Sequence, residues 1–179
     1  MPAVAQGQPP SPAMSKPHHP VASKRAPGEA GRARAYLEAV ARIPVRFQEV
    51  DSLWIVWHGH FVTYLEEGRR AFGRRYGIDY PVFLEHQVAI PVVEVQVNYL
   101  APARLDDVLI VCTRLLRSEA AKLEFEYELR REGGDPQLLA TARTLQVFTS
   151  PQGELLLRWP AFMEERLRAW EEMWITPPS

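Results

Sequence analysis

Apolar and charged residues alternate without interruption over residues 123–130. Leu123, Phe125, Tyr127 and Leu129 are the apolar members, and three glutamates and one arginine stand between and after them. A period of two sends successive side chains to opposite faces, so this segment is expected to be a strand with one buried face. Residues 133–136, Gly-Gly-Asp-Pro, are a strong turn signal, which makes 138–149 the partner strand of a hairpin. An antiparallel sheet follows from this pattern.

Three more segments have the composition of strands. Residues 93–99 alternate in the same way. Residues 108–116 are nearly all apolar, as expected for a central strand covered on both faces. Residues 43–47 form a first strand, with Pro44 near its beginning or at an edge.

A long amphipathic helix is predicted from about Gly59 to Tyr76, because Phe61, Tyr64, Leu65 and Phe72 recur at helical spacing. Gly77 is suited to end it. The order of one strand, one long helix and four strands predicts an α+β domain, in which a curved antiparallel sheet of about five strands wraps around the helix. A C-terminal helix is expected from Pro160 through Trp174.

Composition divides the chain into two parts. Residues 1–37 are rich in Pro, Ala, Gly, Ser and Gln and are expected to be a disordered tail, because they offer too little apolar surface to offset the entropy of ordering. Residues 38–179 are expected to form a single domain, since a chain of 179 residues can bury one core but hardly two.

Charge and cysteine content exclude several classes of protein. A net charge of -1 argues against nucleic-acid binding, which needs clustered Lys and Arg. A single cysteine, Cys112, rules out an internal disulfide and favours the cytoplasm, and its apolar neighbours indicate a buried core thiol. No apolar run approaches the roughly 20 residues of a membrane span.

Residues 51–67 carry the main candidate for chemistry. Asp51 lies between the first strand and the start of the helix, where the free backbone N–H groups near His58 and Gly59 make an electropositive end. Such amides can polarise a carbonyl oxygen while a nearby carboxylate attacks it or activates water. The alternative is structural, with Asp51 capping a turn.

The same segment resembles the signature of hotdog-fold thioesterases of the 4-hydroxybenzoyl-CoA thioesterase type, including those associated with the Tol-Pal system. Asp51, Val56 and Phe61 fall on the family's spacing, and residues 97–109, 123–131 and 139–144 are similar to its later strands. The resemblance covers roughly residues 43–167. It implies a hotdog fold that forms a homodimer or homotetramer with the active site at the subunit interface.

The resemblance also implies a reaction, the hydrolysis of an acyl-CoA or acyl carrier protein thioester without any cofactor beyond the CoA of the substrate. Asp51 would be the nucleophile or the general base. The N–H of His58 would polarise the thioester carbonyl, Gly59 would allow close approach, and the His58 side chain would contact the acyl group or orient water.

Three positions depart from the family pattern. Trp54 replaces a glycine, so the conformation that glycine permits is expected to be unavailable. His60 stands where asparagine is frequent, and Phe61 replaces a tyrosine. Together with Trp57, these residues are candidates for the substrate-binding pocket and suggest an apolar or aromatic acyl group, although aromatic residues at such spacing also occur in cores.

Other arrangements remain open. Glu66 or Glu67 on the helix could supply the carboxylate in place of Asp51, and the domain could bind acyl-CoA or an acyl carrier without hydrolysing it, as a sensor or scaffold. A metal site is not expected, since His58 and His60 lack a third ligand, and no Gly-x-Ser-x-Gly motif indicates a serine hydrolase. Arg104, Arg117 and Arg143 are candidates for contact with phosphate or for solvated surface charge.

Overall fold

The computed structural model describes residues 34–134 and 136–177. Residues 1–33 of the predicted tail therefore lie outside the described residues. The described part contains five strands, three α-helices and two short 3-10 helices. In chain order these are β1 (Tyr36–Pro44), a 3-10 helix (Phe47–Glu49), α1 (His60–Tyr76), α2 (Tyr80–Glu85), β2 (Val92–Tyr99), β3 (Val108–Leu116), β4 (Lys122–Arg131), β5 (Leu138–Val147), α3 (Ala161–Ala169) and a 3-10 helix (Glu171–Met173).

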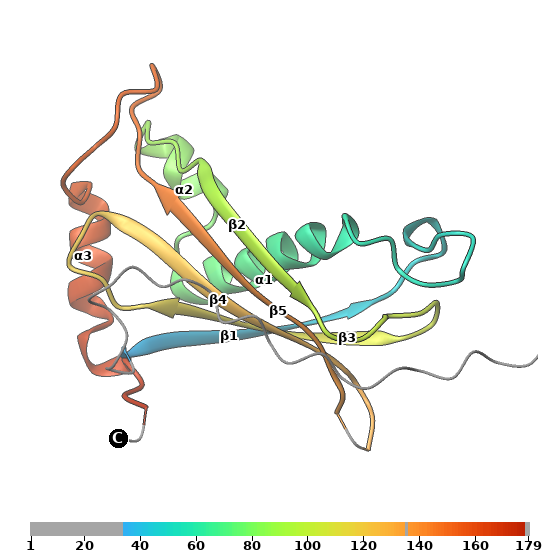
Figure 1. Ribbon diagram of the computed structural model, residues 1–179. Helices are drawn as coiled ribbons and strands as arrows, with labels where there is room; N and C mark the ends of the chain where they lie inside the picture. The colour runs from blue at the N-terminus through green and yellow to red at the C-terminus, as the bar shows by residue number, and fades with distance from the viewer. Residues whose placement is uncertain (1–33, 135, 178–179) are drawn as a thin grey trace, which may run out of the picture. The chain divides into compact units, whose positions relative to one another are not determined.

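The five strands form one antiparallel sheet in the order β1-β3-β4-β5-β2. The predicted hairpin is confirmed, because β4 pairs with β5 across the Gly-Gly-Asp-Pro turn, with Leu129 opposite Ala140. The sheet twists across the long helix α1, which packs mainly against β1 and β3 (Figure 1). The predicted α+β architecture of a curved sheet around one long helix is therefore confirmed.

Only one face of the sheet is deeply buried. In β3, Leu109, Val111 and Thr113 face α1 and are fully buried, while Ile110 and Cys112 on the other face are only partly covered. The prediction that β3 is covered on both faces was wrong. Its apolar run reflects partial burial on the outer face, where neighbouring side chains rather than a second layer shield it.

Helix α1 lies unusually close to β3 at Gly68. A Cβ atom on Gly68 would lie 2.4 Å from Thr113 Oγ1 and 3.0 Å from Val111 Cγ1, so only glycine fits at this crossing. Thr113 is fully buried beneath it, and its hydroxyl has no hydrogen-bond partner in the described part of the chain.

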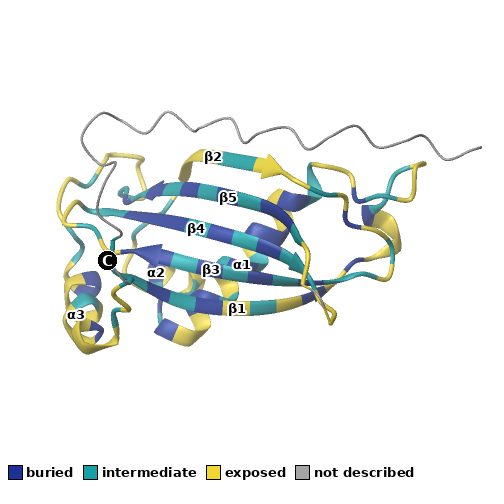
Figure 2. Ribbon diagram, turned by 60° about the horizontal axis from the view of Figure 1, so that its bottom comes forward, coloured by how far each residue is buried: buried dark blue, intermediate teal, exposed yellow. Residues whose placement is uncertain are grey.

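The two edges of the sheet differ. Along β1, Tyr36 and Ile175 exchange backbone hydrogen bonds of 3.0 and 2.8 Å, and the Tyr76 hydroxyl of α1 donates to the Glu38 carbonyl at 2.9 Å. The β2 edge has no strand beyond it among the described residues, and β2 contains no buried residue (Figure 2). One edge is thus occupied by the chain itself and the other is open.

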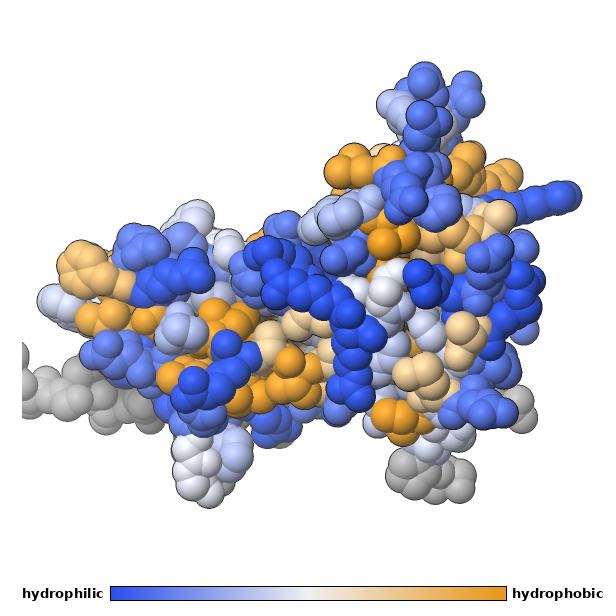
Figure 3. Space-filling view, turned by 180° about the vertical axis from the view of Figure 1, so that it is seen from behind, coloured by the Kyte–Doolittle hydropathy of each residue, from blue (hydrophilic) through white to orange (hydrophobic). Residues whose placement is uncertain are grey.

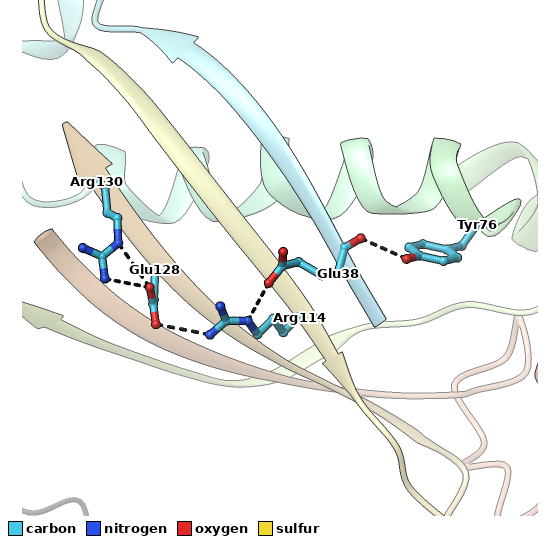
Figure 4. Close-up of polar contacts among 5 residues, drawn as sticks. All are labelled: Glu38, Tyr76, Arg114, Glu128 and Arg130. Atoms are coloured by element: carbon cyan, nitrogen blue, oxygen red, sulfur yellow. Dashed lines mark hydrogen bonds and ion pairs between the residues drawn. The ribbon is translucent and has the colours of Figure 1, made fainter. Parts of the chain in front are cut away.

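Charged side chains pair across the outer face of the sheet. Arg114 on β3 bridges Glu38 on β1 at 2.7 Å and Glu128 on β4 at 3.2 Å, and Arg130 holds the other oxygen of Glu128 (Figure 4). Further along β4, the buried carboxylate of Glu124 accepts hydrogen bonds from Arg34 at 2.9 and 2.5 Å. It also forms ion pairs with Lys122, at 3.5 Å, and with Arg143.

Three elements differ from the sequence prediction. β1 begins at Tyr36 rather than at residue 43, because its Leu-Glu-Ala composition does not mark a strand. The C-terminal helix ends at Ala169, where Trp170 caps it and a 3-10 turn follows. α2 was not predicted, since its six residues are too few to show a period.

Candidate active site

A short paired loop connects the first strand to α1. Val50 and Val56 form an isolated antiparallel bridge, the Asp51 N–H donates to the Ile55 carbonyl at 2.8 Å, and the Trp57 N–H donates to the Glu49 carbonyl at 2.9 Å. The loop is fixed from below, because the Val56 N–H donates to the Ala103 carbonyl at 2.8 Å. This pairing holds Asp51 and the start of α1 in one rigid segment.

Asp51 is partly exposed in this loop. Its Oδ1 accepts a hydrogen bond of 2.8 Å from the Leu53 N–H, so the carboxylate does cap a turn, as the structural alternative predicted. Its other oxygen accepts no hydrogen bond from residues 34–134 or 136–177, and the group is open to solvent. One oxygen therefore orients the carboxylate, and the other is available for chemistry.

Trp54 adopts the backbone conformation that the glycine of the family pattern would supply. Its φ is 60°, in the left-handed region, and its N–H closes the turn onto the Asp51 carbonyl at 2.9 Å. The expectation that tryptophan would exclude this conformation was wrong. The pairing of the loop imposes it on a residue that adopts it only at a cost in free energy.

Two backbone amides remain free where α1 begins. The N–H groups of His60, Phe61 and Val62 turn back to the carbonyls of residues 57, 58 and 59, at 2.9, 3.3 and 3.2 Å. Within the described ranges, the N–H groups of His58 and Gly59 donate to no acceptor. No side chain caps this end and no acidic residue lies in the first turn, so the positive end of the helix dipole is not compensated.

Gly59 is required here by packing. Its φ of -63° suits any residue, but a Cβ atom would lie 1.9 to 2.6 Å from the indole ring of Trp57. The absence of a Cβ atom thus leaves room for the Trp57 ring, and the expected close approach to a substrate stays a prediction.

The candidate aromatic residues do not form one cluster. Trp54 contacts Phe47, at 6.4 Å between ring centroids, and both are exposed. Trp57 packs beside His58 and His60, at 4.8 and 5.7 Å, and forms an exposed patch with them near the free amides. Phe61 is buried among Tyr64 and Tyr99 and supports the helix start from beneath.

Two residues of this region were missed by the sequence reasoning. Tyr99, the last residue of β2, donates from its hydroxyl to the His58 carbonyl at 3.0 Å and ties the open sheet edge to the helix start. Glu49 is almost completely buried and accepts hydrogen bonds from the Tyr64 hydroxyl at 2.7 Å and from the Arg46 N–H at 2.8 Å. Tyr99 belongs to the alternating segment 93–99, which indicates a strand but not a site, and Glu49 follows no periodic pattern.

The other candidates are placed as follows. Glu66 accepts a 3.2 Å hydrogen bond from Tyr80, and Glu67 pairs with Arg70. Arg117 and Arg143 are paired with Glu171 and Glu124, whereas Arg104 forms no ion pair with any described residue. Among the described residues, no group of three His, Cys, Asp or Glu side chains could hold a metal ion.

The sequence matches a protein family over most of the described domain. The model of the thioesterase-like superfamily aligns with residues 45–167, which include the loop, α1 and all strands except β1. The chain belongs to this family. The resemblance found in the sequence is confirmed, and the sheet curved around α1 is the hotdog fold of these proteins.

Individual relatives agree with this assignment. The acyl-CoA thioester hydrolase YbgC of Escherichia coli is 30% identical over 112 residues, covering 62% of this chain and 82% of that protein. The crystal structure of a hypothetical protein from Thermus thermophilus is 35% identical with a TM-score of 0.64, covering 73% of this chain and 97% of that one. The 4-hydroxybenzoyl CoA thioesterase from Pseudomonas sp. shares the fold at 23% identity with a TM-score of 0.64, covering 73% and 99%.

Proposed function

We propose that this protein is a thioesterase that hydrolyses an acyl-CoA, or an acyl carrier protein thioester, to a carboxylic acid and a thiol. The observation that carries the proposal is the pair of free amides at His58 and Gly59, at the uncapped start of α1, in the same segment as the partly exposed Asp51. Membership in the thioesterase-like superfamily and the activity named for its relative YbgC support it.

The roles follow from the chemistry of the groups. The amides would bind the thioester oxygen and stabilise the negative charge that develops when the carbonyl carbon is attacked. A donor of this kind contributes on the order of 3 kcal/mol to transition-state stabilisation. Asp51 would either attack the carbon itself, so that the C–S bond breaks and a mixed anhydride forms, which water then hydrolyses to the carboxylic acid and free Asp51, or remove a proton from a water molecule that attacks the carbon. In both routes the departing thiolate takes up the proton that the water loses. Trp57, His58 and His60 form the exposed patch beside the amides and would contact the substrate. Arg104, whose segment pairs with the loop at Ile55, would contact a CoA phosphate.

We also propose that two subunits associate through the open β2 edge, as a dimer or as part of a tetramer. Val93, Val95 and Tyr99 of this strand are 55%, 44% and 49% exposed, because α1 packs mainly against β1 and β3, toward the other edge of the sheet. Apolar patches separated by hydrophilic side chains are also exposed on the face of the domain that is seen from behind (Figure 3). Because Tyr99 contacts His58, a partner at this edge would border the active site.

The single cysteine is consistent with the cytoplasmic location that we propose. None of the helices in the described part of the chain has the length and apolar composition of a membrane span.

The test is a thiol-release assay on a panel of acyl-CoA substrates, with the wild type beside three variants. Asp51→Asn removes the proposed catalytic carboxylate, and Glu66→Gln removes the alternative one. Asp106→Asn is the matched control, because Asp106 is an exposed carboxylate on a neighbouring loop at φ 68°, where asparagine is well tolerated. The thiol-detecting reagent is expected to react only slowly with the protein's own cysteine, since burial and the nearby Glu38 raise the pKa of the Cys112 thiol to about 12.

We expect Asp51→Asn to lower kcat by at least a hundredfold with little change in substrate binding, while Asp106→Asn keeps wild-type activity. Loss of activity in Glu66→Gln, with Asp51→Asn still active, would assign the catalytic role to Glu66 on α1. A wild type that binds acyl-CoA but releases no thiol from any substrate would establish the alternative function, a non-catalytic acyl-CoA or acyl-carrier binding domain.

A further inference from the structure

A second feature of the domain is a cavity near the C-terminal half of α1. It is a small pocket of about 30 Å³, partly open to solvent, between α1, α2, β4 and β5. Its walls are mostly apolar and include Phe72, Phe83, Phe125 and Ile90. Its polar groups come chiefly from Arg69, Tyr80 and Gln146, and the Gln146 amide is already bound to the Ile90 carbonyl at 2.8 Å.

Arg69 brings a positive charge into this cavity without a matching carboxylate. Its Nη1 donates to the Tyr127 hydroxyl at 3.3 Å, and its Nε is buried with no partner among the described residues. The nearby acids are engaged elsewhere or lie beyond ion-pair distance: Glu66 accepts from Tyr80, and Asp79, which also lines the cavity, forms no ion pair with Arg69. A partly buried guanidinium with an unused N–H is costly unless an anion completes its hydrogen bonds.

The cavity and the candidate active site lie along the same two elements. On α1, Val62, Glu66, Arg69 and Gly73 follow at spacings of four, three and four residues and so form one stripe along the helix. Arg69 is nine residues beyond His60, which at the rise of an α-helix is about 14 Å along the axis.

The strand β2 spans the same interval. Its first residue, Val92, pairs with Gln146 at the cavity, and its last, Tyr99, binds the His58 carbonyl beside the free amides. Val95 and Tyr99 lie opposite Thr144 and Ala140 of β5 and so expose apolar side chains on the helix side of the sheet. These side chains mark an apolar path along β2 from the amides toward the Arg69 guanidinium, beside the Glu66 carboxylate that is hydrogen-bonded to Tyr80.

We infer that the cavity receives the far end of the acyl group and that this end is a carboxylate, so that the substrate is the monothioester of a medium-length dicarboxylic acid. The inference rests on the proposed function, in which the thioester carbonyl lies at the start of α1. The chain of the acyl group occupies the apolar path, and its terminal carboxylate accepts hydrogen bonds from Arg69 Nε and from the rest of the guanidinium.

The experiment compares pairs of acyl-CoA substrates of equal chain length, one ending in a carboxylate and the other in a methyl group. For the wild type, kcat/KM is expected to favour the carboxylate by about tenfold or more at the best length, the factor that one charge-assisted hydrogen bond supplies. In Arg69→Met the ratio is expected to fall to one or below, and in Arg69→Lys to an intermediate value. The ratio of the two kcat/KM values reports only on recognition of the terminal carboxylate, because a loss of folded protein lowers both values by the same factor.

Arg74→Met is the matched control. Arg74 is an exposed arginine of the same helix that does not line the cavity, so its replacement is expected to leave the ratio unchanged. A wild type that prefers the methyl-ended substrate, or a preference that survives in Arg69→Met, would overturn the inference and leave the thioesterase proposal intact.

Calorimetry with the free dicarboxylic acids separates the two proposals if no substrate is hydrolysed. Binding that is lost in Arg69→Met and kept in Arg74→Met would support the carboxylate site while the thioesterase proposal fails. Absence of both hydrolysis and Arg69-dependent binding would overturn both.

Discussion

The buried carboxylate of Glu49 anchors the loop that carries Asp51, and its removal should therefore be costly. The side chain accepts hydrogen bonds from the Tyr64 hydroxyl and the Arg46 N–H, at 2.7 and 2.8 Å. Tyr64 is 1% exposed, so its hydroxyl would lose its partner out of reach of water, and the Arg46 N–H would lose its partner in a partly buried position. Because hydrogen bonds to charged groups contribute about 1.5–3 kcal/mol each, Glu49→Ala should lower the free energy of unfolding by about 3–6 kcal/mol.

Milder variants show how much each hydrogen bond contributes to this loss in the free energy of unfolding. Tyr64→Phe removes one of the two hydrogen bonds and should cost about 1.5–3 kcal/mol, and Glu49→Gln should cost less than Glu49→Ala, because the amide oxygen still accepts. Burial, and then Glu49, raise the pKa of Tyr64, so the phenol remains a donor throughout the working range of pH.

The measurement is urea unfolding of the wild type, Glu49→Ala, Glu49→Gln, Tyr64→Phe and the double variant that combines Glu49→Ala with Tyr64→Phe. The double-mutant cycle should give a coupling energy of about 1–3 kcal/mol between the two positions. Coupling near zero, with Glu49→Gln as stable as the wild type, would show that this carboxylate does not fix the loop.

Three further outcomes follow from the structure. Trp54→Gly should be about 1 kcal/mol more stable than Trp54→Ala in urea unfolding, because both lose the indole but only glycine accepts φ 60° without strain; equal stabilities would contradict a strained backbone at this position. Thr113→Val should raise the free energy of unfolding by about 1 kcal/mol, since it removes a buried hydroxyl that has no partner, and a less stable valine variant would mean that the hydroxyl is satisfied. Burial alone would raise the pKa of Glu124, but Arg34, Arg143 and Lys122 together hold it below its ordinary value of 4.5, so this ion-pair cluster should stabilise the fold above that pH and lose its contribution as the pH falls through the lowered pKa. Thermal unfolding between pH 3 and pH 7 should then be less dependent on pH in Glu124→Gln than in the wild type, and an unchanged dependence would exclude the cluster as its source.

The strands and helices that were predicted well are those in which apolar residues repeat at a regular spacing over many positions. The alternation of residues 123–130 and the helical spacing of residues 59–76 specify buried faces directly, and both elements formed within a residue or so of their predicted bounds. β1 was placed too late, because Leu37, Glu38 and Ala39 favour a helix locally, and only pairing with β3 makes them a strand.

The candidate site was predictable where it depends on the order of residues and not where it depends on contacts across the fold. The position of Asp51 ahead of a helix start follows from the sequence. The hydrogen bonds of Glu49 to Tyr64 and of Tyr99 to His58 join residues 15 and 41 positions apart, and no local pattern signals them. The conformation of Trp54 was misjudged for the same reason, since the paired loop overrides the preference of the residue.

The unequal edges of the sheet limit how far association can proceed. A sheet with two open edges can add strands at both ends and grow into a fibre. Here Ile175 and the Tyr76 hydroxyl occupy the Tyr36–Glu38 end of the β1 edge, whereas no described residue pairs with the outer side of β2, so β2 offers the longer free edge to a second molecule. Once two copies pair there, further edge-to-edge growth is confined to the remaining part of β1.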